Sequence, residues 1–111
     1  LGPRYAGILG SDNGVIADLI AAGRERGENL WQLPLAEEYR GDINSSIADL
    51  KNMGDGYAGT IIGALFLREF TGGLPWAHID FASTAAAGKP YPGHPRGATG
   101  FGVRTLLRYL L

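Results

Sequence analysis

Tyr5-Ala6-Gly7-Ile8-Leu9-Gly10 is the stretch of sequence that decides the fold. This short apolar run follows Pro3 and leads into Ser11-Asp12-Asn13-Gly14, a pattern typical of a buried strand that enters a turn. A helix is predicted directly after the turn, because apolar residues then recur at helical spacing at Val15, Ile16, Leu19 and Ile20. The oxygens of Ser11 to Asn13 can cap its start, and Gly27 is placed to end it. A strand followed by an amphipathic helix indicates an α/β layer.

The middle of the chain is less regular. Leu30 to Leu35 is expected to be extended, because Pro34 biases the preceding residue away from helical dihedral angles. Ala36 to Arg40 is compatible with a short helical turn, and Gly41 to Gly56 is predicted to be an irregular surface or interface segment. Tyr57 to Phe70 is predicted to be a helix with apolar residues around nearly its whole circumference. Such a helix needs burial on more than one side.

The last third of the chain predicts one more strand and one more helix. Trp76 to Ala82 alternates, with Ala77, Ile79 and Phe81 on one face and His78 and Asp80 on the other. A Gly/Pro loop follows from Gly88 to Gly97, and Val103 to Leu111 then has the leucine spacing of a final helix. The order of elements predicts part of a layered α/β domain, and 111 residues suffice for one compact domain.

Composition excludes several classes of function. The net charge of −1 provides no field to hold a nucleic-acid backbone, so nucleic acid is not an expected partner. Cysteine is absent, which excludes disulfides and thiolate metal sites. No apolar run is long enough to cross a bilayer and the first residues do not resemble a signal peptide, so we expect a soluble protein without a membrane partner.

His78 and Asp80 form the most suggestive pair of metal-binding residue types. They lie two apart on one face of the predicted strand, and Asp49 or His94 is a candidate third ligand. Two polar residues at strand spacing are common, however, so a hydrogen-bonded structural pair is the favoured interpretation. The residues alone therefore predict no metal ligands.

Other candidate sites are also weak. Gly97, Gly100 and Gly102 precede the last helix as in a phosphate-binding loop, but no Gly-Lys-Ser/Thr sequence follows, so tight backbone packing is the preferred explanation. No serine lies in a G-x-S-x-G elbow. Glu25 and Glu28, like Glu37 and Glu38, are interpreted as solvated surface charges. No catalytic residue is predicted.

Five stretches together resemble the C-terminal part of the leucyl aminopeptidase, or cytosol aminopeptidase, family. They occur in the family's order and at its spacing over almost the entire chain: Leu30 to Leu35; Ser46 to Asn52; Ala58-Gly59 with Phe66 to Phe70; Trp76 to Ala82; and Gly97 to Gly100 with Val103 to Leu106. The resemblance implies a partial three-layer α/β/α domain with a mixed sheet, in which residues 1–111 form the C-terminal segment of a catalytic domain. The segment is expected to be incomplete without the remainder of that domain.

The resemblance also implies a chemistry. Family members remove N-terminal amino acids from peptides with two bridged divalent metals, zinc or manganese, held by the motifs K-G-x-x-x-D-S-G-G and N-T-D-A-E-G-R. Neither motif occurs here, so this chain alone is expected to bind no metal and to be inactive. The substrate-binding residues implied by the resemblance are Ala82 and Ala85, at the edge of the pocket for the substrate's N-terminal side chain. The small Ala85, where some members carry Met, implies room for a bulky apolar side chain.

Family resemblance further implies a cytoplasmic homohexamer with peptide substrates. The alternative is a non-catalytic binding or assembly module that kept the fold and lost the chemistry. A DNA-binding role, known for some members, is disfavoured by the near-neutral charge.

Overall fold

The computed structural model describes residues 1–111. Its elements are, in chain order, β1 (Tyr5–Gly10), α1 (Asn13–Glu25), β2 (Asn29–Gln32), the 3₁₀ helix η1 (Glu37–Ile43), α2 (Gly59–Arg68), β3 (Ala77–Asp80), β4 (Ala86–Ala87), β5 (Gly97–Ala98) and α3 (Val103–Leu110). Each strand and helix predicted from the sequence is present within a few residues of its expected bounds. The two short strands β4 and β5, which flank the Gly/Pro loop, were not expected.

The central sheet is mixed, as the family resemblance implied. Its strand order is β2-β1-β3, with β1 parallel to β2 and antiparallel to β3. In the antiparallel pair, Ile8 lies opposite Ile79 and Leu9 opposite His78. The central position of β1 explains why its sequence is almost entirely apolar: both faces of this strand are covered.

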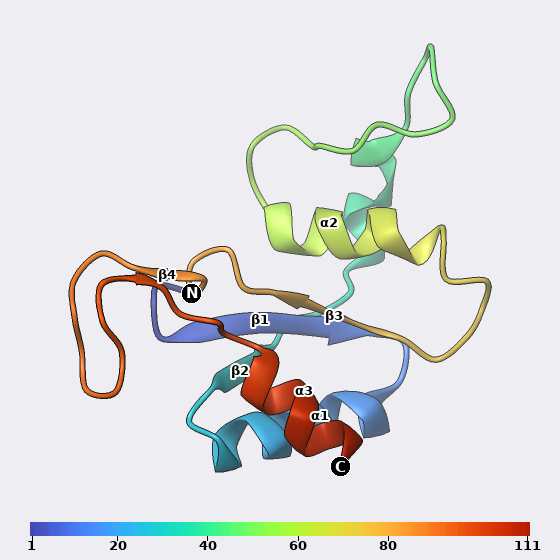
Figure 1. The fold of residues 1–111 in the computed structure, drawn as a ribbon. Helices are drawn as coiled ribbons and strands as arrows, with labels where there is room; N and C mark the ends of the chain where they lie inside the picture. Colours follow the sequence, from blue (N-terminus) through green and yellow to red (C-terminus); the bar gives the residue numbers. More distant parts are fainter.

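Helices cover both faces of the sheet. Figure 1 shows α1 and α3 on one side and α2 on the other, which confirms the three-layer arrangement. The core cluster lies between the sheet and α1 and consists of Ala6, Ile8, Ile16, Leu19 and Leu30. Ala77 and Ile79 pack against this cluster, so the face of β3 predicted to be apolar is the one that points toward α1.

α1 begins and ends as its sequence predicts. Asp12 is the N-cap residue, and its carboxylate accepts hydrogen bonds from the backbone N–H groups of Gly14 (2.8 Å) and Val15 (3.1 Å). After the helix, Gly27 has a φ of +74°, a left-handed conformation that favours glycine.

α2 differs from its expected environment. Its inner face buries Ile62, Ala64 and Leu65 against η1 and the sheet. Its outer face is uncovered: Leu67 is 42% exposed, and Phe70, just after the helix, is 69% exposed. The expectation of burial on more than one side is therefore not met within this chain, because residues 1–111 supply no layer outside α2.

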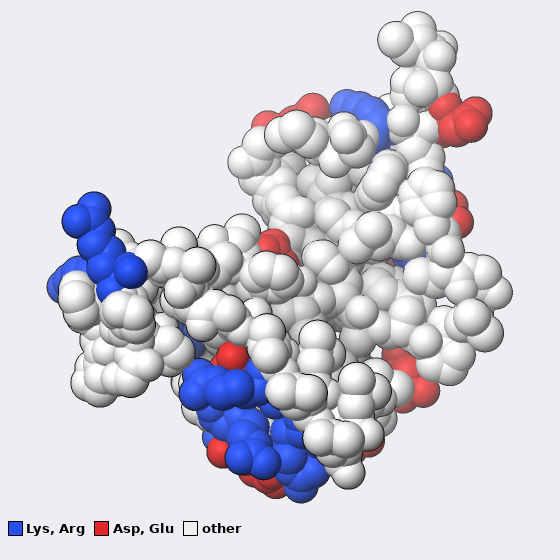
Figure 2. Space-filling model, in the orientation of Figure 1, with Lys and Arg blue, Asp and Glu red and all other residues white.

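α3 also leaves its apolar stripe uncovered. Thr105 is its one buried residue, whereas the leucines are exposed: Leu106, Leu107, Leu110 and Leu111. Figure 2 shows positive side chains gathered over the α1 and α3 side, with mostly uncharged side chains across the middle of the same view. None of the helices combines the length and apolar character needed to cross a bilayer.

Candidate functional site

The turn after β3 carries both residues that the family resemblance assigns to substrate binding. The N–H groups of Thr84 and Ala85 both donate to the carbonyl oxygen of Phe81, at 3.0 and 2.9 Å. These bonds close a tight turn in which Ala82 is exposed, Thr84 is buried and Ala85 is half-buried. The turn therefore presents two small side chains on either side of a buried threonine.

Asp80 joins this turn to α2. Its Oδ2 accepts a hydrogen bond from Thr60 Oγ1 at 2.5 Å, and its Oδ1 accepts one from the N–H of Ala82 at 3.1 Å. The hydrogen bond from Thr60 is the main reason that the pKa of Asp80 lies below its ordinary value, with smaller contributions from Ala82, His78 and the N-terminal amine; burial opposes them. Asp80 is thus held ionised between two elements.

Gly7 allows α2 to approach the sheet at this point. A Cβ at Gly7 would lie 3.2 Å from Thr60 Cγ2 and 3.1 Å from Leu33 Cδ1, closer than side chains normally pack. The absence of a side chain on β1 therefore lets Thr60 reach Asp80 across the strand.

A shallow cavity of about 180 Å³ lies beside these residues. Its lining residues are Leu1, Tyr5, Gly7, Thr60, Asp80, Ala82 and Ser83. Ala82 is among them and Ala85 is not, so the structure places only one of the two expected binding residues at this cavity. Ala85 lies on the other side of the turn, next to β4, which begins at Ala86.

His78 and Asp80 lie together on the half-buried face of β3 that points toward α2, but neither candidate third ligand joins them. The 111 residues contain no group of three or more His, Cys, Asp or Glu side chains that could hold a metal. Burial lowers the pKa of His78, and the Asp80 carboxylate only partly offsets this effect. Asp80 makes hydrogen bonds with Thr60 and Ala82, whereas the interpretation of His78 and Asp80 as a structural pair stays a prediction.

The N-terminus of α3, which follows the glycine-rich segment, binds a carboxylate side chain of the same chain. Glu28 is 2% exposed, and its carboxylate accepts hydrogen bonds from Gly102 N–H (3.1 Å), Thr105 N–H (2.8 Å) and Thr105 Oγ1 (2.7 Å). The interpretation of Glu28 as a solvated charge is therefore wrong, because the N-terminus of α3 needs an acceptor for its free N–H groups. Gly102 has a φ of +99° and Gly100 one of +67°, so left-handed backbone, and not tight packing, explains these glycines.

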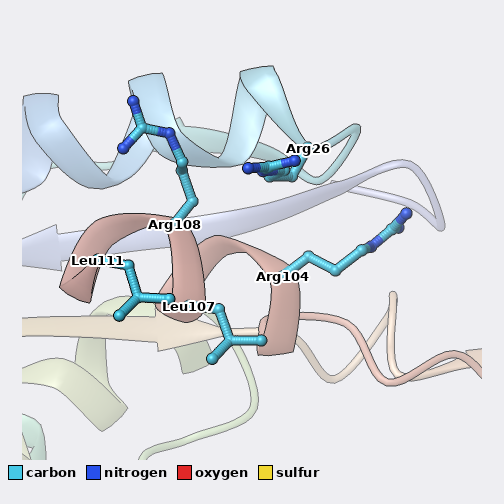
Figure 3. A pocket seen from close by; sticks show the side chains of 5 residues that line it. All are labelled: Arg26, Arg104, Leu107, Arg108 and Leu111. Carbon is cyan, nitrogen blue, oxygen red and sulfur yellow. The ribbon is translucent and has the colours of Figure 1, made fainter.

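A larger hollow of about 330 Å³ lies between the end of α1 and α3. Figure 3 shows Arg108 directed from α3 toward α1 and Arg26 at the end of α1, whereas the side chains of Leu107 and Leu111 extend from α3 on the side away from α1; all four are among the residues that line the hollow. Arg108 pairs with Glu25 at 2.6 Å, and Arg104 lies 3.5 Å from Glu28. Two of the three arginines are therefore neutralised by acidic residues of the chain, so the hollow is a weaker candidate for a site.

The sequence interpretation missed Thr60, Thr99 and Glu28, which organise these regions. Thr99 Oγ1 donates to the carbonyl oxygen of Thr84 at 2.6 Å, and Thr99 N–H donates to that of Ala85 at 2.9 Å. Of these three residues, only Glu28 could have been anticipated from the sequence. Gly102 lies at the N-cap position of α3 and has no side chain to cap the helix, so the free N–H groups there need an acceptor from elsewhere in the chain.

The sequence of this chain is similar to the sequences of cytosol aminopeptidases. A sequence model described as the cytosol aminopeptidase family, catalytic domain, matches residues 1–107. The chain is 48% identical to a probable cytosol aminopeptidase of Geobacter sulfurreducens over 99% of its length, and 48% identical to one of Caulobacter vibrioides over 97%. It spans 22% of the length of each of these relatives.

Solved structures show the same similarity. The bottromycin maturation enzyme BotP superposes with a TM-score of 0.93 at 38% identity, over 99% of this chain and 25% of that one. A mutant of tomato leucine aminopeptidase superposes with a TM-score of 0.89 at 35% identity, over 100% of this chain and 21% of that one. The mixed α/β fold of these enzymes is therefore shared over the whole chain.

Proposed function

Because this chain belongs to the cytosol aminopeptidase family and covers part of its catalytic domain, we propose that it works as the C-terminal portion of a leucyl aminopeptidase that removes N-terminal amino acids from peptides. The observation that carries the proposal is the match to the catalytic-domain model over residues 1–107. The chain spans 22% of the curated relatives, so the rest of the active site is assigned to other parts of the catalytic domain.

The metal-dependent chemistry of the family does not fit the donors of this chain. BotP is described in complex with Mn, and for the parent enzyme we propose two divalent metals, zinc or manganese. Here no three metal-binding side chains come together, and both oxygens of Asp80 already accept hydrogen bonds. A two-metal centre needs several convergent carboxylates. Residues 1–111 alone are therefore proposed to be inactive, and no step through a metal is derived for them.

This chain contributes a pocket edge to the proposed reaction. We propose that two small side chains border the substrate's N-terminal side chain: Ala82, which lines the cavity beside Asp80, and Ala85, which lies outside that cavity on the same hydrogen-bonded turn. Replacing Ala85 by Met in the complete protein should therefore disfavour bulky apolar N-terminal residues. Rates of hydrolysis of leucine and phenylalanine amides, before and after Ala85→Met, test this role, and an unchanged preference would contradict it.

Uncovered apolar surface supports the proposed partner, the remainder of the catalytic domain. Leu67 and Phe70 on the α2 side, and Leu110 on the α3 side, are 42%, 69% and 75% exposed. These side chains lie on both outer helical layers, where further protein would cover them. A homohexamer located in the cytoplasm, with peptides as substrates, completes the proposal.

The test compares two proteins. Residues 1–111 and the complete reading frame that encodes them are each purified and assayed for release of leucine from leucine amide with added manganese or zinc. We expect turnover by the complete protein and none by residues 1–111. Turnover by the short chain would overturn its proposed inactivity, and a complete protein without turnover would favour the assembly-module alternative.

A further inference from the structure

The turn from Ala82 to Ala85 is fixed at both ends by residues outside it. At its start, Asp80 accepts a hydrogen bond from the N–H of Ala82. At its end, Thr99 donates twice, from Oγ1 to the carbonyl of Thr84 (2.6 Å) and from N–H to the carbonyl of Ala85 (2.9 Å). The geometry of the turn is therefore set by Asp80, which immediately precedes it on β3, and by Thr99, which lies further along the chain.

Asp80 and Thr99 are themselves anchored to other elements. Asp80 is bound by Thr60 in the first turn of α2. Thr99 directly follows β5, whose Ala98 pairs with Ala86 of β4, and its Oγ1 also accepts a hydrogen bond from the N–H of Phe101 just before α3. The two ends of the turn are thus connected to α2 on one side of the sheet and to the approach to α3 on the other.

The middle of the turn has two further side-chain hydrogen bonds, of which the first is local, from Thr84 Oγ1 to the carbonyl of Phe81 at 3.2 Å. Ser83 Oγ donates to the carbonyl of Gly2 at 2.7 Å, and Figure 1 shows the N-terminus lying beside β4. Thr84 is only 3% exposed. If the Thr99 hydroxyl is lost, bulk water therefore cannot replace it as the hydrogen-bond donor to the Thr84 carbonyl unless the turn rearranges. Loss of the Thr99 hydroxyl should therefore tilt the peptide that joins Thr84 to Ala85 and move the Ala85 side chain.

We infer that Asp80 and Thr99 are positioning residues that hold Ala82 and Ala85 in place and thereby set which N-terminal side chain the pocket accepts. This inference rests on the proposed function and extends it, because neither residue needs to touch the substrate. It assigns selectivity for bulky apolar N-terminal residues to hydrogen bonds beneath the pocket edge, in addition to the size of the alanines.

The decisive variant is Thr99→Val in the complete protein, because valine keeps the shape of threonine and retains the backbone N–H but lacks the hydroxyl. The measured quantity is the ratio of kcat/KM for a phenylalanine amide to that for an alanine amide, which is independent of the fraction of folded enzyme. We expect this ratio to change at least about fivefold, since small changes in an apolar pocket alter discrimination by factors of this size. Thr99→Ser, which restores the hydroxyl, should return the ratio to within about twofold of wild type.

Thr71→Val is the matched control. Thr71 Oγ1 also donates to a backbone carbonyl, that of Arg68 at 2.9 Å, but it lies at the far end of α2. Its ratio should equal that of wild type. Asp80→Asn perturbs the other end of the turn and provides a second variant if Thr99→Val does not fold; it too should change the ratio.

The outcomes separate the two proposals. An unchanged ratio in Thr99→Val, or in Asp80→Asn where the first variant does not fold, overturns the positioning role. An equal change in Thr71→Val, or no recovery in Thr99→Ser, also overturns it. A wild-type protein that releases neither amino acid overturns the proposed function, and the inference fails with it. A changed ratio with recovery by serine supports both.

Discussion

α1 and α2, the two longest helices, cover opposite faces of the same sheet, yet they are built differently. α1 turns an apolar stripe toward the core, exposes polar residues such as Asp18 and Arg24, and begins at a side-chain cap from Asp12. α2 is apolar on both its inner and outer faces and begins after Ala58, which has a left-handed φ of +52° and no side-chain cap. The difference shows that α1 itself is capped and buries its apolar stripe within this chain, whereas the outer face of α2 stays uncovered, as does the apolar stripe of α3.

The largest expected difference in unfolding free energy is between a buried side chain of α1 and an exposed side chain on the outer face of α2. Ile16→Ala on α1 removes a residue with 0% exposure and should lower the free energy of unfolding by about 2–5 kcal/mol. Leu67→Ala on the outer face of α2 should lower it by less than about 1 kcal/mol. Urea unfolding of residues 1–111 measures both. Equal losses would break the comparison, because they would show that the outer face of α2 is already covered.

Glu28 tests whether the free N–H groups at the start of α3 depend on a buried carboxylate of the chain itself. Glu28→Gln keeps the shape but places an amide group against N–H donors, and should cost about 1–3 kcal/mol of unfolding free energy. Glu25→Gln is the matched control, since Glu25 pairs with Arg108 at the exposed surface and should cost no more than about 1 kcal/mol. The same urea experiment applies. A larger loss for Glu25 would contradict the burial of Glu28.

Asp80 ties α2 to the sheet by a contact that depends on pH. Its folded-state pKa lies below the ordinary value of 3.8, so its stabilising contribution is present above that pH and is lost as the pH falls through the folded pKa. Unfolding midpoints measured between neutral pH and pH 3 should therefore decline less at the acid end for Asp80→Asn than for wild type. His78 faces the same carboxylate, so His78→Gln serves as the control that isolates the histidine.

The smallest expected changes in unfolding free energy come from alanine-to-glycine substitutions, which should have opposite signs at the start of α2 and within α1. Ala58→Gly should raise the free energy of unfolding by about 0.5–1 kcal/mol, because glycine adopts the left-handed conformation that costs alanine energy. Ala21→Gly, at an exposed position within α1, should lower it by up to about 1 kcal/mol. Thermal unfolding resolves both changes. Destabilisation by Ala58→Gly would show that the start of α2 is not strained.

Local patterns predicted most of the fold. The apolar run of β1, the helical spacing from Val15 to Ile20 and the alternation around Ile79 depend only on neighbouring residues, and the structure confirms each element. β4 and β5 were not predicted, because two-residue strands carry no periodicity. The three-layer arrangement and the mixed sheet came from the resemblance to a family, since local patterns do not fix strand order.

The candidate site was less predictable because its contacts join distant parts of the chain. Thr60 and Asp80 are 20 residues apart, and Thr99 contacts a carbonyl 15 residues before it. Glu28 was misassigned for the same reason: its neighbours in sequence are charged and polar, while its partners lie in α3. Ala82 and Ala85 lie on a turn after β3, and their role in substrate binding stays a prediction.

Glu28 also carries a consequence for the order of events during synthesis. Its main acceptor contacts are with Thr105, 77 residues further along the chain. While a ribosome has delivered α1 and β2 but not yet α3, this carboxylate lacks its partners and stays hydrated. We expect the corner between α1 and β2 to become fully packed only after α3 has been synthesised.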